Sequence, residues 1–139
     1  MGHALVTAFE LTSNATYLDT AITLLRDIQA AWDDTCCGTR KGGLWCASAA
    51  CCWTILNRCR ILCRWDRNHT QKATASNAGG VILALRVHQN RPDPKLVDFA
   101  VKVYKFWRAN MVLPSGQVSD HYNHDGTLLN WSFTYNQGG

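Results

Sequence analysis

The stretch ATYLDTAITLLRDIQAAW, residues 15–32, decides which architecture is expected of this chain. Its apolar side chains recur at the spacing of one helical face, at positions 17, 18, 21, 24, 25, 28 and 32. Polar residues such as Asp19 and Arg26 fill the opposite face. The pattern predicts an amphipathic helix with one buried face, which needs other helices to cover it.

The segments on both sides of this helix repeat its character. Residues 4–11 and 69–90 are predicted to be helical, and a third apolar stripe runs from Leu96 to Trp107. The turn at residues 12–14 contains capping residues, and Asp93-Pro94 supplies an N-cap followed by proline at the first helical position. Strand-like alternation is rare. The sequence therefore predicts an all-α fold of antiparallel helical hairpins that repeat along the chain.

Composition narrows the class of protein further. The chain has 139 residues, of which 47% are apolar and 17% charged, as expected of one folded domain. Residues 46–64 hold three arginines and no acid, so the net charge of +4 leaves only +1 for the rest (4 − 3). Nucleic-acid binding is therefore not expected. No apolar run is long enough for a membrane span, and the sequence does not specify an oligomeric state.

Seven cysteines crowd into 28 residues, at positions 36, 37, 46, 51, 52, 59 and 63. An odd number cannot pair completely within one chain, so buried or unpaired thiols are expected. Zinc sites need repeated C-x2-C or cysteine–histidine spacing, and His69 is the one nearby histidine. A cysteine-rich metal-binding module remains the weaker alternative.

The adjacent acids Asp33-Asp34 lie where the helix of residues 15–32 ends. Glycoside hydrolysis uses two carboxyl groups, one to protonate the leaving oxygen and one to attack or to activate water. Acids at the end of a helix oppose its dipole, so this pair does not serve helix stability. The pair is either an acid/base couple or two loop acids that cap the next turn. The segment His121–Gly126 half-matches a calcium loop, but its first and twelfth positions do not fit.

Several segments together resemble glycoside hydrolase family 76, the endo-α-1,6-mannanase-like proteins of fungi and bacteria. The most specific are WDDTCCGTRKGGLW (residues 32–45), KATASN (residues 72–77) and TYNQG (residues 134–138). The resemblance implies an incomplete (α/α)6 barrel of about four helices over residues 1–139, in a fungal-type fragment. It also implies extracellular or cell-wall association, but the residues after Met1 show no signal peptide, so this chain's location stays open.

The family acts on α-1,6-linked mannose without a cofactor or metal. Its catalytic aspartates belong to a motif that would precede Met1, so no catalytic residue is expected here, with Asp33 and Asp34 as the weaker alternative. The chain is then inactive by itself, and the alternative function is a non-catalytic carbohydrate-binding or interaction fragment. In such barrels the N-termini of inner helices face the cleft. Contacts with α-mannan or mannooligosaccharide are accordingly expected from Trp45, Trp65, Lys72, Ser76, Asn77, Tyr135, Asn136 and Gln137.

Residues 46–64, CASAACCWTILNRCRILCR, interrupt this family pattern. The segment joins GGLW to WDRNHTQKATASN, holds five of the seven cysteines and fits no element of the family. Its 19 residues correspond to 57 nucleotides, three for each residue, which is about the size of a short fungal intron. We interpret the segment as an atypical insert, such as a retained intron.

Overall fold

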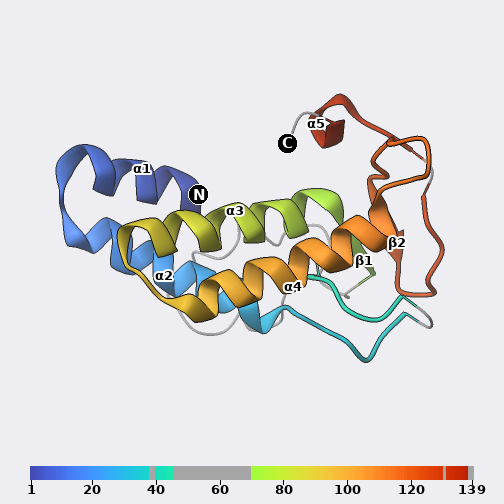
Figure 1. Ribbon diagram of the computed structural model, residues 1–139, viewed down its shortest axis with the longest axis horizontal. Coiled ribbons are helices and arrows are strands. Elements are labelled where there is room, and N and C mark those ends of the chain that lie inside the picture. The colour runs from blue at the N-terminus through green and yellow to red at the C-terminus, as the bar shows by residue number, and fades with distance from the viewer. Residues whose placement is uncertain (38–39, 46–69, 130, 138–139) are drawn as a thin grey trace.

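The computed structural model describes residues 1–37, 40–45, 70–129 and 131–137. Within these residues the chain is mostly helical, with a small two-stranded sheet (Figure 1). The elements are α1 (Gly2–Thr12), α2 (Ala15–Ala30), β1 (Gln71–Ala73), α3 (Thr74–Asn90), α4 (Pro94–Met111), β2 (His121–Asn123) and α5 (Thr134–Gln137). The prediction of an all-α chain with about four helices is confirmed, and α5 adds a short fifth helix. The interpretation of residues 46–64 as an insert concerns residues outside this description and stays a prediction.

The first hairpin joins α1 to α2 through the predicted turn. Ser13 adopts a left-handed conformation (φ 57°) and donates its backbone N–H to the carbonyl of Phe9, which closes the end of α1. The side-chain oxygen of Asn14 then accepts the N–H of Thr16 and caps the start of α2. These local bonds reverse the chain within two residues.

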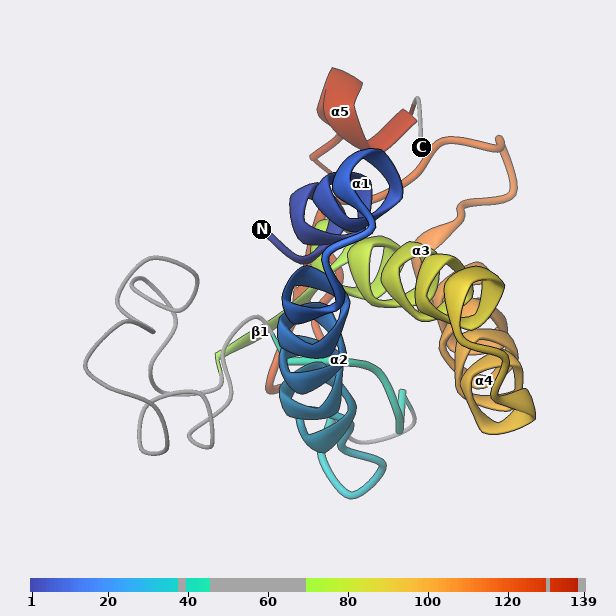
Figure 2. The same cartoon turned by 90° about the vertical axis from the view of Figure 1, so that its left-hand side faces the viewer.

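The second hairpin joins α3 to α4, which lie side by side along their length (Figures 1 and 2). As predicted, Asp93 is the N-cap of α4 and Pro94 its first residue, and the Asp93 carboxylate accepts the N–H of Lys95. Because α3 and α4 are antiparallel, the start of α3 and the end of α4 lie at one end of the hairpin. We call this the polar end, and it also contains residues 31–37, 40–45, 117–129 and 131–137.

Apolar faces of the two hairpins meet in one interior. Leu25 of α2 and Leu83 of α3 are 1% and 2% exposed and belong to the same cluster. The remaining buried members come from all four long helices: Val6, Leu18, Ala21, Ala84, Val87, Leu96 and Ala100. The stripe expected in residues 15–32 therefore faces the other helices, as its periodicity predicts.

Strands β1 and β2 fasten the polar end together. They pair antiparallel, with Lys72 opposite Tyr122. β1 leads directly into α3, so the segment predicted to be helical from residue 69 begins as a helix only at Thr74. The prediction was wrong for residues 71–73 because their backbone groups pair with β2, a partner that local helical periodicity does not reveal.

The pair Gly79-Gly80 lies inside α3, where glycine normally lowers helix stability. A Cβ atom at Gly80 would lie 2.6 Å from Cδ1 of Leu44 and 3.2 Å from Cγ2 of Ile28. A Cβ atom at Gly79 would meet nothing within 4 Å. Close packing therefore explains one glycine of the pair and leaves the other without a steric role.

We predict opposite effects for alanine at these neighbouring positions. Gly79→Ala should raise the free energy of unfolding by about 0.5–1 kcal/mol, because it restricts the unfolded chain without a clash. Gly80→Ala should lower it by about 1–3 kcal/mol, because Leu44 and Ile28 must shift in a packed interior. Urea unfolding followed by circular dichroism measures both changes. Effects of the same sign would contradict the packing described here.

Candidate functional site

After α2, residues 31–37 and 40–45 form a loop that folds back on itself. The N–H of Asp33 donates to the carbonyl of Gly43 (3.1 Å), and that of Trp45 donates to the carbonyl of Ala31 (3.2 Å). Gly42 and Gly43 have φ values of 103° and 91°, which favour glycine. The ring of Phe106 in α4 occupies the space that a side chain at Gly43 would need. The loop can therefore lie flat against α4.

Lys72 of β1 is completely buried beneath this loop. Its Nζ donates to the carbonyl oxygens of Asp33 (2.6 Å) and Gly42 (2.7 Å). The same nitrogen lies 4.6 Å from the ring centroid of Trp45, within the range of a cation–π contact. Burial lowers the pKa of Lys72, and the negative charges of Asp33 and Asp34 partly oppose that effect. The side chain joins both halves of the loop to β1.

The Asp33 carboxylate is held by hydrogen-bond donors on both oxygens. Oδ1 accepts the N–H (2.8 Å) and the hydroxyl (2.6 Å) of Thr35, and Oδ2 accepts Nε1–H of Trp45 (3.0 Å). Burial raises the pKa of Asp33, but these bonds and the Lys72 charge outweigh it and lower the pKa to about 2. Asp33 is therefore ionised at neutral pH, whereas a general acid needs a raised pKa. Asp34 is exposed.

At the start of α3, Asn77 bonds to the same loop. It is fully buried, its Oδ1 accepts the N–H of Leu44 (2.9 Å), and its Nδ2 donates to the carbonyl of Ala73 (2.8 Å). Ser76 beside it is half-buried. Asn77 thus fixes the strand-like stretch around Leu44 against the first turn of α3.

Asp120 is the centre of a second polar network, which the sequence did not indicate. Its Oδ1 accepts the hydroxyl of Tyr135 (2.6 Å) and Nδ2–H of Asn136 (2.8 Å), and its Oδ2 lies 2.8 Å from Nδ1 of His121. Burial opposes ionisation, but these three partners keep the pKa of Asp120 below its ordinary value. The N–H of Thr74 also donates to the Asp120 carbonyl (2.7 Å). This network connects α5 to the start of α3.

Gln137 ties the end of the described chain to the same region. Its Nε2–H donates to the carbonyl of Val118 (2.8 Å), and its Oε1 accepts the N–H of Val118 (3.0 Å). The Gln137 amide thus pairs with one backbone residue as a neighbouring strand would. Tyr135 and Asn136 bond to Asp120, so the three polar residues 135–137 of α5 all attach this helix to the rest of the fold.

Aromatic side chains at the polar end differ in exposure. Trp45 is 9% exposed, packed under Lys72 and bonded to Asp33. Trp131, Phe133 and Tyr135 are 64%, 42% and 63% exposed, and the rings of Phe133 and Tyr135 stack with centroids 5.4 Å apart. Trp65, which was expected to contact sugar, lies outside the described residues. At the polar end, the exposed aromatic side chains of the described chain therefore lie in residues 131–135, which we call the aromatic segment.

The cysteines and acids of the described ranges form no metal centre. No group of three or more histidine, cysteine or acidic residues there could hold a metal ion. Cys36 and Cys37 form a disulfide with each other, so the expectation of unpaired thiols was wrong for these two. Consecutive cysteines can pair without a distant partner, which counting cysteines does not reveal. No described helix is both long and apolar enough to cross a bilayer.

The fold is thus two antiparallel helical hairpins that share an apolar interior, with carboxylates and aromatic side chains gathered at one end. The chain belongs to glycosyl hydrolase family 76, whose model matches residues 1–139. Among curated proteins, none matches the sequence.

Several solved structures share the fold. The α-1,6-mannanase of a Salegentibacter species is 25% identical, with a TM-score of 0.73 over 99% of this chain and 36% of its own. A protein from Listeria innocua is 26% identical, with a TM-score of 0.76 over 99% of this chain and 34% of its own. An inactive variant of the Salegentibacter enzyme, with two consecutive aspartates changed to asparagine, was solved with α-1,6-mannotriose. This chain thus spans about a third of the length of these relatives, and its helices correspond to part of the α/α barrel.

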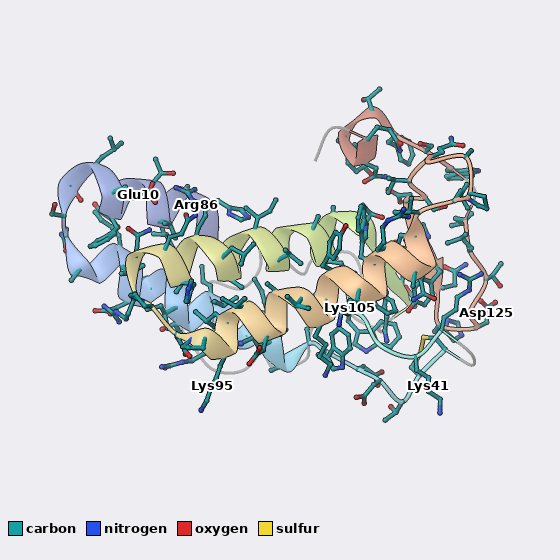
Figure 3. The ribbon with its side chains drawn as sticks, in the orientation of Figure 1. Glu10, Lys41, Arg86, Lys95, Lys105 and Asp125 are labelled. Carbon is teal, nitrogen blue, oxygen red and sulfur yellow. A yellow bond between two sulfur atoms is a disulfide. The ribbon has the colours of Figure 1, made fainter. Side chains whose placement is uncertain are left out.

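We predict that Lys72→Met lowers the free energy of unfolding by about 2–4 kcal/mol. The methionine fills the space but leaves the carbonyl of Asp33 without the Lys72 donor, and leaves that of Gly42 with only the longer bond from the Tyr122 hydroxyl (3.2 Å). The control is Lys105→Met on the exposed face of α4 (Figure 3), which should change stability by less than about 0.5 kcal/mol. Urea unfolding measures both. Equal effects would show that Lys72 does not hold the loop.

The low pKa of Asp33 predicts an acid-dependent loss of stability. Because the folded protein lowers this pKa from 3.8 to about 2, the contribution is complete above about pH 4 and is lost as the pH falls towards 2. Asp33→Asn should therefore flatten the decline of the urea midpoint across this range. Parallel curves for the wild type and Asp33→Asn would contradict the bonding described for Asp33.

Proposed function

We propose that this chain forms part of the sugar-binding end of an α-1,6-mannan hydrolase. The observation that carries the proposal is the exposed aromatic segment beside the Asp120 network. Exposed apolar surface that is rimmed by polar groups is typical of binding sites. Aromatic rings present flat apolar faces of the kind on which the C–H faces of sugar rings can stack. The family match and the mannooligosaccharide bound to the Salegentibacter enzyme support α-1,6-mannosides as the ligand class.

Of the residues expected to contact sugar, Tyr135 is the best placed. It belongs to the aromatic segment, and its hydroxyl is oriented by Asp120. Lys72, Asn77 and Gln137 instead direct their polar atoms to backbone groups, so we assign them the role of shaping this end of the molecule. Ser76 and Trp45 keep their expected place beside this end, and a direct sugar contact from either stays a prediction.

We further propose that Asp33 and Asp34 do not form the catalytic pair. A retaining or inverting glycosidase needs one carboxyl group that is protonated in the resting enzyme. Asp33 is ionised, and both its oxygens accept bonds from Thr35 and Trp45. On this proposal the chain binds mannosides and does not cleave them by itself, so its catalytic aspartates must come from elsewhere in the family's barrel.

Binding of α-1,6-mannotriose, followed by tryptophan fluorescence or calorimetry, tests the proposal. Trp131→Ala should weaken binding roughly tenfold, because truncating an exposed aromatic contact typically costs about 1–2 kcal/mol. Tyr104→Ala is the matched control, since Tyr104 is a half-exposed aromatic residue on α4 and should leave affinity unchanged. Maltotriose, an α-1,4-linked glucose trimer, tests ligand class and should bind far more weakly.

The same samples are assayed for released mannose. No release is expected from the wild type. Release that Asp33→Asn or Asp34→Asn abolishes would overturn the assignment of these residues. Equal binding of both trisaccharides, or equal loss in both aromatic variants, would overturn the sugar-binding proposal.

A further inference from the structure

The disulfide between Cys36 and Cys37 lies where the loop after α2 meets the end of α4 and the turn after β2. Cys37 is 6% exposed and belongs to a cluster with Trp45, Phe106, Met111 and Tyr122. Cys36 is more accessible, and its Sγ lies 3.6 Å from the carbonyl oxygen of His124. Figure 3 shows the pair between the loop that carries Lys41 and the turn that carries Asp125. The bond therefore lies in the loop formed by residues 31–37 and 40–45, where this loop meets the turn after β2.

This disulfide cannot stabilise the protein in the usual way. A cross-link stabilises a fold mainly by restricting the unfolded chain, and that effect grows with the number of residues enclosed. Here the bond joins consecutive residues, so it encloses no loop. Its effect must be local, on the backbone between Cys36 and Cys37.

The local backbone shows what the bond holds. Cys37 has φ 76°, in the left-handed region that residues with a side chain rarely adopt. In this conformation its carbonyl accepts the N–H of Arg40 (3.1 Å). Gly126 packs so closely on that carbonyl that a Cβ atom there would lie 3.2 Å from the oxygen. The bond from Arg40 in the loop and the packing of Gly126 in the turn after β2 therefore both depend on the left-handed conformation of Cys37.

We propose that Cys36–Cys37 is a redox site that fixes the loop formed by residues 31–37 and 40–45 when oxidised and releases it when a dithiol reduces it. Without the bond, Cys37 can leave the left-handed region. Its carbonyl then moves away from Arg40 and Gly126, and the bonds that Asp33 makes to Trp45 and Thr35 lose their support. The proposal concerns the conformation of the loop and does not depend on sugar binding.

Reduction follows ordinary thiol–disulfide exchange. A thiolate of the dithiol attacks the more accessible Cys36 Sγ, the Cys36–Cys37 bond breaks, and the Cys37 sulfur leaves and takes up a proton. The second thiol of the reagent then attacks the mixed disulfide. This step releases the Cys36 thiol and the reagent as a cyclic disulfide. Two electrons and two protons pass to the protein, and the reagent is oxidised by the same amount.

Peptide mapping measures the oxidation state of Cys36 and Cys37 separately from that of the other five cysteines. Trypsin cleaves after Arg26 and Arg40, and the peptide of residues 27–40 contains Cys36 and Cys37 and no other cysteine. Native protein is treated with dithiothreitol, thiols are alkylated, and the peptide is weighed. We expect no alkylation before the reductant and two alkyl groups after it, with return to the unalkylated form when oxidised glutathione follows dithiothreitol. Alkylation before any reductant, or resistance until denaturant is added, would overturn the proposal.

Hydrogen exchange tests whether reduction of the disulfide changes the conformation of the loop or only breaks the cross-link. The amides of Asp33, Arg40 and Trp45 donate to loop carbonyls and should exchange at least tenfold faster after reduction. Amides in α1 serve as the internal control and should not change. A Cys36→Ser/Cys37→Ser variant should show the fast exchange with or without dithiothreitol. Reduction that leaves the exchange of the loop unchanged, or that accelerates α1 equally, would overturn the proposal.

Discussion

The buried ammonium group of Lys72 is the constraint on which the polar end depends. Removing a charged group from water is costly, so its surroundings must supply compensating partners. The carbonyls of Asp33 and Gly42 and the ring of Trp45 do so, and they come from both halves of one loop. The loop must therefore close around β1 in a single way. That closure also brings Leu44 to Asn77 and so sets the start of α3.

The helices could be predicted from the sequence because their causes are local. The stripe from residue 17 to residue 32 and the cap at Asp93 each depend on neighbours within a few positions. The strand of residues 71–73 could not be predicted, since its hydrogen bonds go to residues 121–123, some fifty positions away. The periodicity of a helix can be seen in a single sequence. The pairing of two strands depends on contacts between residues that are distant in the sequence.

The sequence indicated which residues belong to the candidate site, but it did not indicate which groups their polar atoms bond to. Lys72, Asn77 and Asn136 lie at one end of the helices, and the contact with sugar that the resemblance implied for them stays a prediction. Their polar atoms meet mostly backbone carbonyls and a carboxylate, because closed loops leave buried main-chain groups that need partners. The role of Asp120 could not be predicted, because no motif surrounds it and its three partners lie at different distances along the chain.

The bond pair between Gln137 and Val118 has a consequence for how this region can change in evolution. The primary amide of glutamine holds its donor and its acceptor side by side, as the backbone of a neighbouring strand does, and an ionised glutamate would set a second acceptor against the carbonyl of Val118. The partner atoms belong to the backbone, so this contact restricts the amide at position 137 and sets no requirement on which side chain stands at position 118. Burial restricts Val118 for a separate reason, since that side chain is 8% exposed. Methods that seek correlated substitutions would therefore not detect the contact.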